Sequence, residues 1–216
     1  MSGFMIMTLK RIPSAKKLDV KTDLLKIDSI LTVVFFFLLS CSEDVASSTE
    51  ETQQDEVEIT LAEIFLLNNL DENRGYCLDI KGYKTNADPT RGLQAHTCYS
   101  YQGSIAVDQS FDIDRMNSGQ FYLPGFEVCV ELSPQNGTYE IKLSACDLSN
   151  NAQNLKLTDK GEITFANDPS LCLTASDKES REGGGGEPVH LIRDLSITSC
   201  EDQKKAYQRW GLRSSN

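Results

Sequence analysis

The stretch GYCLDI, residues 75–80, decides the fold, because the chain repeats its pattern twice more. Residues 127–132 read EVCVEL and residues 170–175 read SLCLTA, each with a cysteine inside a short apolar run typical of a β-strand. A second cysteine ends another short run each time, in GLQAHTC at 92–98, EIKLSAC at 140–146 and DLSITSC at 194–200. The recurrence predicts one structural unit used three times.

Cysteine usage predicts disulfides rather than a metal site. Of the seven cysteines, Cys41 directly follows the leader described below, and six remain. Spacing alone leaves every pairing of six cysteines open. The repetition favours one bond within each repeat, Cys77–Cys98, Cys129–Cys146 and Cys172–Cys200. Thiolate metal sites use close pairs such as C-x₂-C, which the sequence lacks, so we expect no metal.

Two further features recur with the cysteines. Each repeat opens with an apolar run, AEIFL at 62–66, GQFYL at 119–123 and GEITF at 161–165, and ends in glutamine, any residue and a hydrophobe. The glutamine elements are Gln109-Ser-Phe111, Gln153-Asn-Leu155 and Gln208-Arg-Trp210. About four short runs per repeat, broken by turn residues, predict an all-β fold of about twelve short strands.

The N-terminal part reads as a leader and a spacer. Residues 1–40 combine a basic region with a short apolar run from Ile30 to Leu39, the layout of a secretory signal peptide. Leu38-Leu39-Ser40-Cys41 resembles the lipobox of bacterial lipoproteins, which predicts lipid attachment at Cys41. An ordinary signal peptide and an uncleaved anchor are the alternatives. Residues 41–60 are acidic and poor in large apolar residues, so we expect a flexible linker.

This organisation predicts an exported protein, lipid-anchored at a bacterial outer membrane or cell surface, or otherwise secreted. The chain carries a formal net charge of −11. Such a charge repels phosphate backbones, so nucleic acid is not an expected partner.

The Cys-Φ-Asp-Φ strand, the Gln-x-Trp element and the within-repeat disulfide together resemble the ricin B-type lectins, whose domain is a β-trefoil. The resemblance covers residues 61–215, with repeats at approximately 61–117, 118–159 and 160–215. It implies that the hydrophobe of each glutamine element belongs to the shared core. Only Trp210 keeps the family's tryptophan, but Phe111 and Leu155 remain apolar.

The resemblance also implies a shallow sugar pocket wherever a repeat keeps five polar positions. In the first repeat these positions are Asp79, Gln94, His96, Asp108 and Gln109. The carboxylate of Asp79 suits sugar hydroxyls, His96 offers a flat ring, and Gln109 is expected to hold Asp79 in place. Tyr99 and Tyr101 follow and are candidates for the rim.

The other two repeats depart from the family's set. The second repeat has Glu131, Lys142, Ser144, Ala152 and Gln153, and Lys142 is expected to pair with Glu131. The third repeat has no carboxylate and carries Thr174, Ser196, Thr198, Tyr207 and Gln208. The third repeat also contains EGGGGEP at 182–188, expected to be an exposed insertion, followed by His190 in an apolar run expected to be a strand.

The sequence therefore predicts a carbohydrate-binding module without catalysis and without cofactors, with one sugar pocket in the first repeat. The expected partners are glycans or glycoconjugates, with a galactose-type sugar as the first candidate, and a membrane reached through the lipid anchor. The alternative is a β-trefoil that binds no sugar and serves protein interaction. A glycosidase pair of Asp79 and Asp108 is not favoured, because the family's pocket is shallow and does not enclose a bond.

Overall fold

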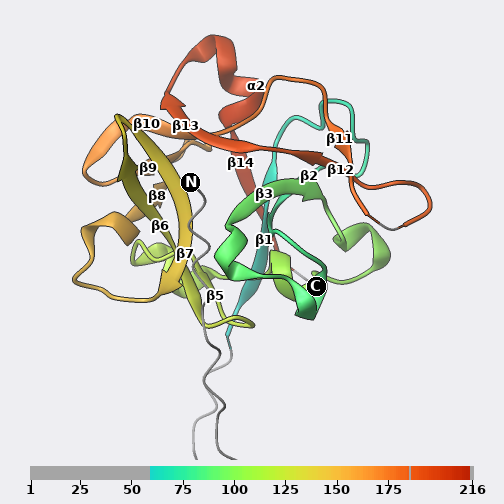
Figure 1. Ribbon diagram of the computed structural model, residues 1–216, viewed down its shortest axis with the longest axis horizontal. Helices are drawn as coiled ribbons and strands as arrows, with labels where there is room; N and C mark the ends of the chain where they lie inside the picture. Colours follow the sequence, from blue (N-terminus) through green and yellow to red (C-terminus); the bar gives the residue numbers. More distant parts are fainter. Residues whose placement is uncertain (1–58, 185, 215–216) are drawn as a thin grey trace, which may run out of the picture. The chain divides into compact units, whose positions relative to one another are not determined.

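The structure is a computed structural model that describes residues 59–184 and 186–214. Short strands dominate this part of the chain, and both α-helices within it are single turns, α1 (Ile113–Asn117) and α2 (Lys205–Gln208). The strands of the first two repeats are β1 (Leu61–Leu66), β2 (Tyr76–Ile80), β3 (Leu93–Thr97), β4 (Phe111–Asp112), β5 (Tyr122–Leu123), β6 (Val128–Gln135), β7 (Thr138–Ala145) and β8 (Leu155–Leu157). Those of the third are β9 (Ile163–Phe165), β10 (Asp168–Ala175), β11 (Arg181–Glu182), β12 (Leu191–Arg193), β13 (Leu195–Ser199) and β14 (Trp210–Ser214). The predicted all-β fold is confirmed (Figure 1).

The central hairpin of each repeat pairs in one register. In the first repeat Cys77 lies opposite His96, and Asp79 lies opposite Gln94. The corresponding pairs are Cys129–Ser144 and Glu131–Lys142 in the second repeat, and Cys172–Thr198 and Thr174–Ser196 in the third. Side chains alternate between the two faces of a strand. In every repeat this register therefore places the residue two positions after the first cysteine beside the residue four positions before the second cysteine.

Equivalent positions from the three repeats fill one apolar core. The buried hydrophobes of the glutamine elements are Phe111, Leu155 and Trp210, each at most 2% exposed. The opening strands contribute a second set, Ile64, Phe121 and Ile163, and the residues after the first cysteines a third, Leu78, Val130 and Leu173. The antiparallel pairing of β1 with β14, from Ala62–Ser214 to Leu66–Trp210, joins the first strand to the last. The threefold sequence repeat is thus a threefold repeat of core packing.

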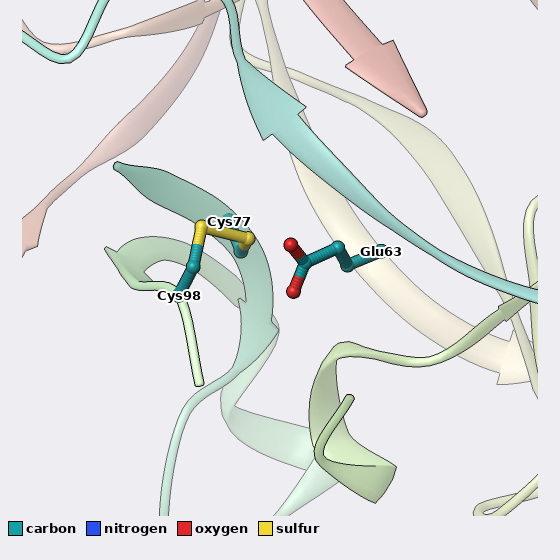
Figure 2. A group of neighbouring side chains, drawn as sticks. All are labelled: Glu63, Cys77 and Cys98. Carbon is teal, nitrogen blue, oxygen red and sulfur yellow. A yellow bond between two sulfur atoms is a disulfide. The ribbon is translucent and has the colours of Figure 1, made fainter. Parts of the chain in front are cut away.

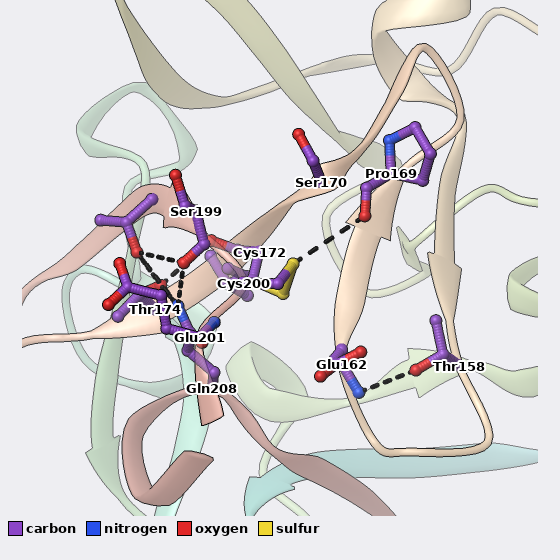
Figure 3. Close-up of a disulfide and its surroundings, with 12 residues drawn as sticks. Thr158, Glu162, Pro169, Ser170, Cys172, Thr174, Ser199, Cys200, Glu201 and Gln208 are labelled. Atoms are coloured by element: carbon purple, nitrogen blue, oxygen red, sulfur yellow. Dashed lines mark hydrogen bonds between the residues drawn. A yellow bond between two sulfur atoms is a disulfide. The ribbon is translucent and has the colours of Figure 1, made fainter. Parts of the chain in front are cut away.

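Each repeat contains its own disulfide, with the pairing that the repetition favoured: Cys77–Cys98, Cys129–Cys146 and Cys172–Cys200. Each bond ties the first strand of the central hairpin to the residue just after the second strand. Figure 3 shows the third bond between the hairpin strands, with Gln208 and Thr174 on the adjoining face. A disulfide in a small domain typically stabilises it by about 2–4 kcal/mol.

The third repeat has two strands more than a four-strand unit needs, β11 and β12. β12 pairs with β3 of the first repeat, with Ile192 opposite His96, so the two run side by side (Figure 1). Arg74 fixes the preceding turn by donating hydrogen bonds to the backbone carbonyls of Pro188 and Val189. His190 lies just before β12 rather than within a strand, and it is buried. The insertion therefore packs onto the first repeat, a contact that the sequence did not predict.

The signal peptide at 1–40, the lipidation site Cys41 and nearly all of the linker at 41–60 lie outside the described residues. Within the described ranges, no helix has the length and apolar character of a membrane-spanning segment.

Candidate functional site

The structure brings the five first-repeat residues together. Asp79 and Gln94 face each other across β2 and β3, and Gln94 Nε2 donates to Asp79 Oδ1 over 2.9 Å. Gln109, at the end of the single turn η4 (Val107–Gln109), donates from Nε2 to the other carboxylate oxygen over 3.0 Å. The ring of His96 lies beside them, with Nδ1 3.9 Å from Asp79 Oδ2. The backbone N–H of Lys84 donates to Asp108, the fifth member.

These residues form a buried cluster and do not line an open pocket. Asp79 is 1% exposed and Asp108 is 0% exposed, and the other three are at most 5% exposed. Both oxygens of Asp79 accept from side-chain amides. The sequence predicted that these groups line a shallow pocket, whereas in the structure their side chains are buried. His190, just before β12, contacts the ring of His96, and the backbone N–H of Lys84 contacts Asp108.

The contacts of Gln109 recur in all three repeats. Its side-chain oxygen accepts from the backbone N–H of Tyr99, and its Nε2 also donates to the carbonyl of Thr97. Gln153 and Gln208 each accept from the N–H after the second cysteine of their repeat and donate to the carbonyl before it. Figure 3 shows the contacts of Gln208. The repeated glutamine is therefore a structural element, which in the first repeat also fixes Asp79.

Burial sets the electrostatics of the two carboxyl groups. It raises the pKa of Asp79 well above its ordinary value, and the nearby charge of Asp108 raises it further. Burial also raises the pKa of Asp108, although the N–H of Lys84 opposes this change. Lys84 reaches that position with a φ of 47°, in the left-handed region that non-glycine residues seldom adopt. Asp108 Oδ1 is buried and has no hydrogen-bond partner among the described residues, so it is a spare acceptor.

The ring of His96 is covered by two other rings. Its centroid lies 5.2 Å from that of Tyr99 and 5.1 Å from that of His190, the latter in an edge-to-face arrangement. Its Nδ1 lies 2.9 Å from the carbonyl oxygen of Thr97 and donates to it. Burial lowers the pKa of His96 to about 4, so the ring is neutral at pH 7. His96 therefore has no free ring face, and the two rings packed against it, Tyr99 and His190, are buried as well.

We expect acid to destabilise the wild-type protein more than a His96→Gln variant. The unfolded imidazole takes up a proton near its ordinary pKa of 6.5, and the folded one only near 4. The unfolded state then binds more protons across this range, so stability falls as the pH falls through it. The wild-type protein should lose about 3 kcal/mol more than the variant between pH 7 and pH 4.

The measurement is urea unfolding at pH 7, 5.5 and 4 with the disulfides intact. The raised pKa of Asp79 acts in the opposite direction, because protonation of the buried carboxyl favours the folded state as the pH falls. This contribution is present in both proteins, so the difference between them isolates His96. Parallel pH dependences would contradict a buried neutral imidazole.

A hollow of about 320 Å³ lies over the buried cluster. Aromatic, basic, amide and glycine residues line it: Tyr83, Lys84, Tyr99, Gln102, Gly184, Gly186 and His190. The ammonium of Lys84 lies 5.4 Å from the centroid of the Tyr83 ring and 5.6 Å from that of Tyr99. Except for Tyr99, the sequence did not predict these lining residues. The only signal for His190 was its apolar surroundings, which indicated burial but no partner.

Comparison with known proteins shows a likeness in structure. No family model matches the chain, and no curated protein matches it in sequence. The C-terminal half of an earthworm R-type lectin, solved with GalNAc, superposes with a TM-score of 0.50 at 18% identity, over 72% of this chain and 98% of that one. The chain has the fold of an R-type lectin, the β-trefoil.

Two further structures were found. A mutant of an earthworm lectin C-terminal domain, solved with 6′-sialyllactose, has a TM-score of 0.49 and 17% identity over 72% of this chain and 98% of that one. The β-trefoil lectin of the Vibrio vulnificus hemolysin/cytolysin, solved with N-acetyl-D-lactosamine, has a TM-score of 0.47 and 14% identity over 74% and 97%.

Within this R-type lectin fold, the second repeat differs from the expectation in one contact. Lys142 pairs with Glu140 over 3.2 Å and not with Glu131. Glu131 accepts instead from Ser144 and from Gln153, so it takes the structural place of Asp79. The hydrogen bonds from neutral groups lower the pKa of Glu131, Ser144 contributing most. The second repeat therefore uses its carboxylate within the fold.

The third repeat keeps an open hollow at the equivalent position, also of about 320 Å³. Four of the five equivalent residues line it, namely Thr174, Ser196, Thr198 and Tyr207. Carboxylates do reach this hollow, from Asp177 and Asp194 in the flanking loops. The comparison of the three repeats did not point to Asp177 and Asp194, because they lie outside the five polar positions that the family resemblance implies.

One group of potential metal ligands is accounted for by a disulfide. Glu63, Cys77 and Cys98 place a carboxylate oxygen and two sulfurs within 4.8 Å of one another. Figure 2 shows the carboxylate pointing at the Cys77–Cys98 bond. Because the two sulfurs are bonded to each other, neither is a thiolate, and one carboxylate oxygen of Glu63 already accepts from Ser100 and Arg213. This group does not fit a metal ion while the bond is intact.

Proposed function

We propose that this domain binds carbohydrate in the first-repeat hollow and does not cleave it. One observation carries the proposal: five polar residues that a sugar-binding repeat would keep converge under an aromatic-lined hollow, in a domain with the fold of an R-type lectin. The earthworm lectin of that fold was solved with GalNAc bound. We infer a glycan or glycoconjugate as the ligand, with a galactose-type sugar as the first to test.

The chemistry of the lining suits a hydroxylated ring. Aromatic faces pack against the C–H side of a pyranose, and Tyr83, at 53% exposure, is the most accessible ring there. Lys84 and Gln102 supply donors for hydroxyl oxygens. Lys84 lines the hollow, and its backbone N–H donates to the carboxylate of Asp108. The oxygen Oδ1 of that carboxylate, which has no partner among the described residues, therefore lies close to the hollow. In this arrangement Asp79 acts indirectly, by holding Gln94 and Gln109 in place below the binding surface.

Hydrolysis is not supported by this geometry. A glycosidase places two carboxyl groups on either side of the scissile bond. Here Asp79 and Asp108 lie under the hollow, and neither is among the residues that line it. The proposed role is recognition alone.

A glycan array tests the proposal with a matched pair of variants. Tyr83→Ala removes the most exposed ring of the hollow, and Tyr139→Ala removes a similarly exposed tyrosine, at 39%, from β7 in the second repeat. We expect the wild-type protein and Tyr139→Ala to bind the same glycans. Tyr83→Ala should bind about tenfold more weakly, because stacking on one aromatic ring contributes roughly that factor.

Absence of binding to every glycan would contradict the proposal. It would favour the second candidate, a β-trefoil that binds no sugar and serves as a protein-interaction module. That candidate has a specific observation in its favour, the closure of Asp79 and Asp108 from solvent. Equal losses of glycan affinity in Tyr83→Ala and Tyr139→Ala would indicate that the glycan binds outside the first-repeat hollow.

We also propose that the protein is exported and anchored to a bacterial membrane through Cys41. Three disulfides in one domain support an oxidising compartment. Metabolic labelling with palmitate tests the anchor: label should enter the wild-type protein and not a Cys41→Ser variant. Release of unlabelled wild-type protein into the medium would contradict anchoring and indicate secretion.

A further inference from the structure

A second hollow, of about 480 Å³, adjoins the first-repeat site. The residues used in the argument below are Asn73, Arg74, Ser100, Tyr101, Ser104 and Arg213. Two of them are arginines, and the other four carry hydroxyl or amide groups. None of the described residues that line this hollow is acidic. In a chain of net charge −11, two arginines that meet in one hollow without a lining carboxylate need an explanation.

Each arginine forms an ion pair with a buried carboxylate. Glu63, at 0% exposure, pairs with Arg213, whose guanidinium also lies 4.7 Å from the centroid of the Phe65 ring. Glu72 pairs with Arg74 over 2.5 Å. The side chain of Arg213 is still 42% exposed, and its Nη1 makes no hydrogen bond with any described residue. The guanidinium is thus fixed in place with part of its donor edge free, which lowers the entropic cost of binding an anion.

One tyrosine connects the two hollows. The ring of Tyr101 lies under Arg74, with 5.2 Å from the guanidinium carbon to the ring centroid. The hydroxyl of Tyr101 lies 3.0 Å from Nε2 of His190, which lines the first-repeat hollow. Both hollows also border the single turn η3 (Ser100–Gln102). A ligand larger than one sugar ring therefore has a second polar surface within reach of the first.

We propose that this second hollow binds an anionic group, a carboxylate or a sulfate, on the glycan whose neutral ring occupies the first-repeat hollow. The inference rests on the proposed function and names its substrate class: an acidic oligosaccharide. The guanidinium of Arg213, whose Nη1 has no partner among the described residues, supplies the paired N–H donors that recognise either anion. The Nε and Nη2 donors of Arg74 are already taken by Glu72 and Val189, so Arg74 lines the hollow without offering a second paired edge. The serine hydroxyls and Asn73 supply further donors to the remaining oxygens.

The preference should be moderate in size. Each arginine is already neutralised by its glutamate, and the chain as a whole is acidic. The gain therefore comes from hydrogen bonds at short range rather than from long-range attraction. We expect an acidic glycan to bind about fivefold more tightly than its neutral counterpart, with the advantage falling as salt rises.

A matched-pair glycan array tests the preference. Neutral, sulfated and sialylated versions of each core glycan are compared on the wild-type protein, Ser104→Asp and Ser104→Asn. Ser104 is exposed and lines the hollow, so an aspartate there introduces a repelling charge and an asparagine does not. The acidic preference should disappear in Ser104→Asp and persist in Ser104→Asn, and neutral glycans should bind all three proteins equally. The sulfated and sialylated arms identify which anion is preferred.

Inorganic sulfate provides a readout that does not depend on sugar binding. Sulfate, compared with chloride at equal ionic strength, should shift the backbone NMR resonances of Tyr101 and Ser104 in the wild-type protein and not in Ser104→Asp. Sulfate shifts without binding to any glycan would uphold the anion site and overturn the proposed function. Glycan binding without acidic preference, together with no sulfate shifts, would overturn the anion site and leave the proposed function standing. Loss of the preference in Ser104→Asn would also contradict it.

Discussion

Replacing Gln109 with leucine is expected to lower the free energy of unfolding by about 3–5 kcal/mol. The substitution nearly conserves volume, so the loss reports on hydrogen bonds rather than on a cavity. Gln109 is 0% exposed and satisfies three buried groups, the N–H of Tyr99, the carbonyl of Thr97 and the carboxylate of Asp79. Each buried polar group that loses its partner costs about 1–3 kcal/mol.

The same substitution in the third repeat should cost less. Gln208 contacts the hydroxyls of Thr174 and Thr198, but these hydroxyls also bond to each other over 2.9 Å. They remain partly satisfied without the glutamine, and no buried carboxylate depends on it. Gln135→Leu, on the exposed end of β6, is the control and should change stability by less than about 0.5 kcal/mol. Urea unfolding with intact disulfides measures all three variants. A loss below about 1 kcal/mol for Gln109→Leu would contradict a structural role for the first-repeat glutamine.

The second large loss of stability is expected for a substitution of Trp210, the core residue at the start of the last strand, β14. Trp210→Ala should destabilise the protein by about 3–5 kcal/mol, because Trp210 is the largest fully buried side chain among the described residues. Its Nε1 also donates to the carbonyl of Leu173 over 3.1 Å, which ties β14 to β10 within the third repeat. Since β14 pairs with β1, the lost packing affects the contact between the first and last strands as well.

Trp210→Phe separates packing from hydrogen bonding. Phenylalanine fills most of the volume, as Phe111 does in the first repeat, and leaves only the Leu173 carbonyl without its donor. We expect a loss of about 1–2 kcal/mol for this variant, clearly smaller than for Trp210→Ala. The same urea titration measures both. Equal losses for the two variants would contradict the assignment of this position to a tightly packed threefold core.

The repeat made most of the fold predictable. The cysteine runs recur in the same order three times, and this repetition favoured the pairing within each repeat that the structure shows, although the two cysteines of a pair are 21, 17 and 28 residues apart. The resemblance to ricin B-type lectins implied that Phe111, Leu155 and Trp210 belong to the core, and all three are buried there. Local pattern and global fold agree at these positions.

The sequence predicted which residues lie together in the candidate site, but not that they are buried. The resemblance to ricin B-type lectins implied that Asp79, Gln94 and Gln109 lie together, and the register of β2 and β3 and the contact from Gln109 to Asp79 bring them together. Their burial was not predictable, because β12 packs beside β3 and reaches it from a point 94 residues further along the chain, where Leu191 donates to Thr97. A glycine-rich segment has no hydrophobic period from which its packing could be inferred. The hydrogen bond from Lys84 to the carboxylate of Asp108 was equally hidden, because its donor is the backbone N–H of a residue with an unusual φ and not the lysine side chain.

The most direct test of the central claim is an NMR titration of the isotopically labelled protein with the glycan that binds best on the array. The account predicts that the resonances that move on binding are those of the first-repeat hollow, above all Tyr83, Lys84, Tyr99, Gln102 and His190. Shifts confined to the third-repeat hollow, around Asp177 and Tyr207, would contradict it, as would a spectrum that does not change at all.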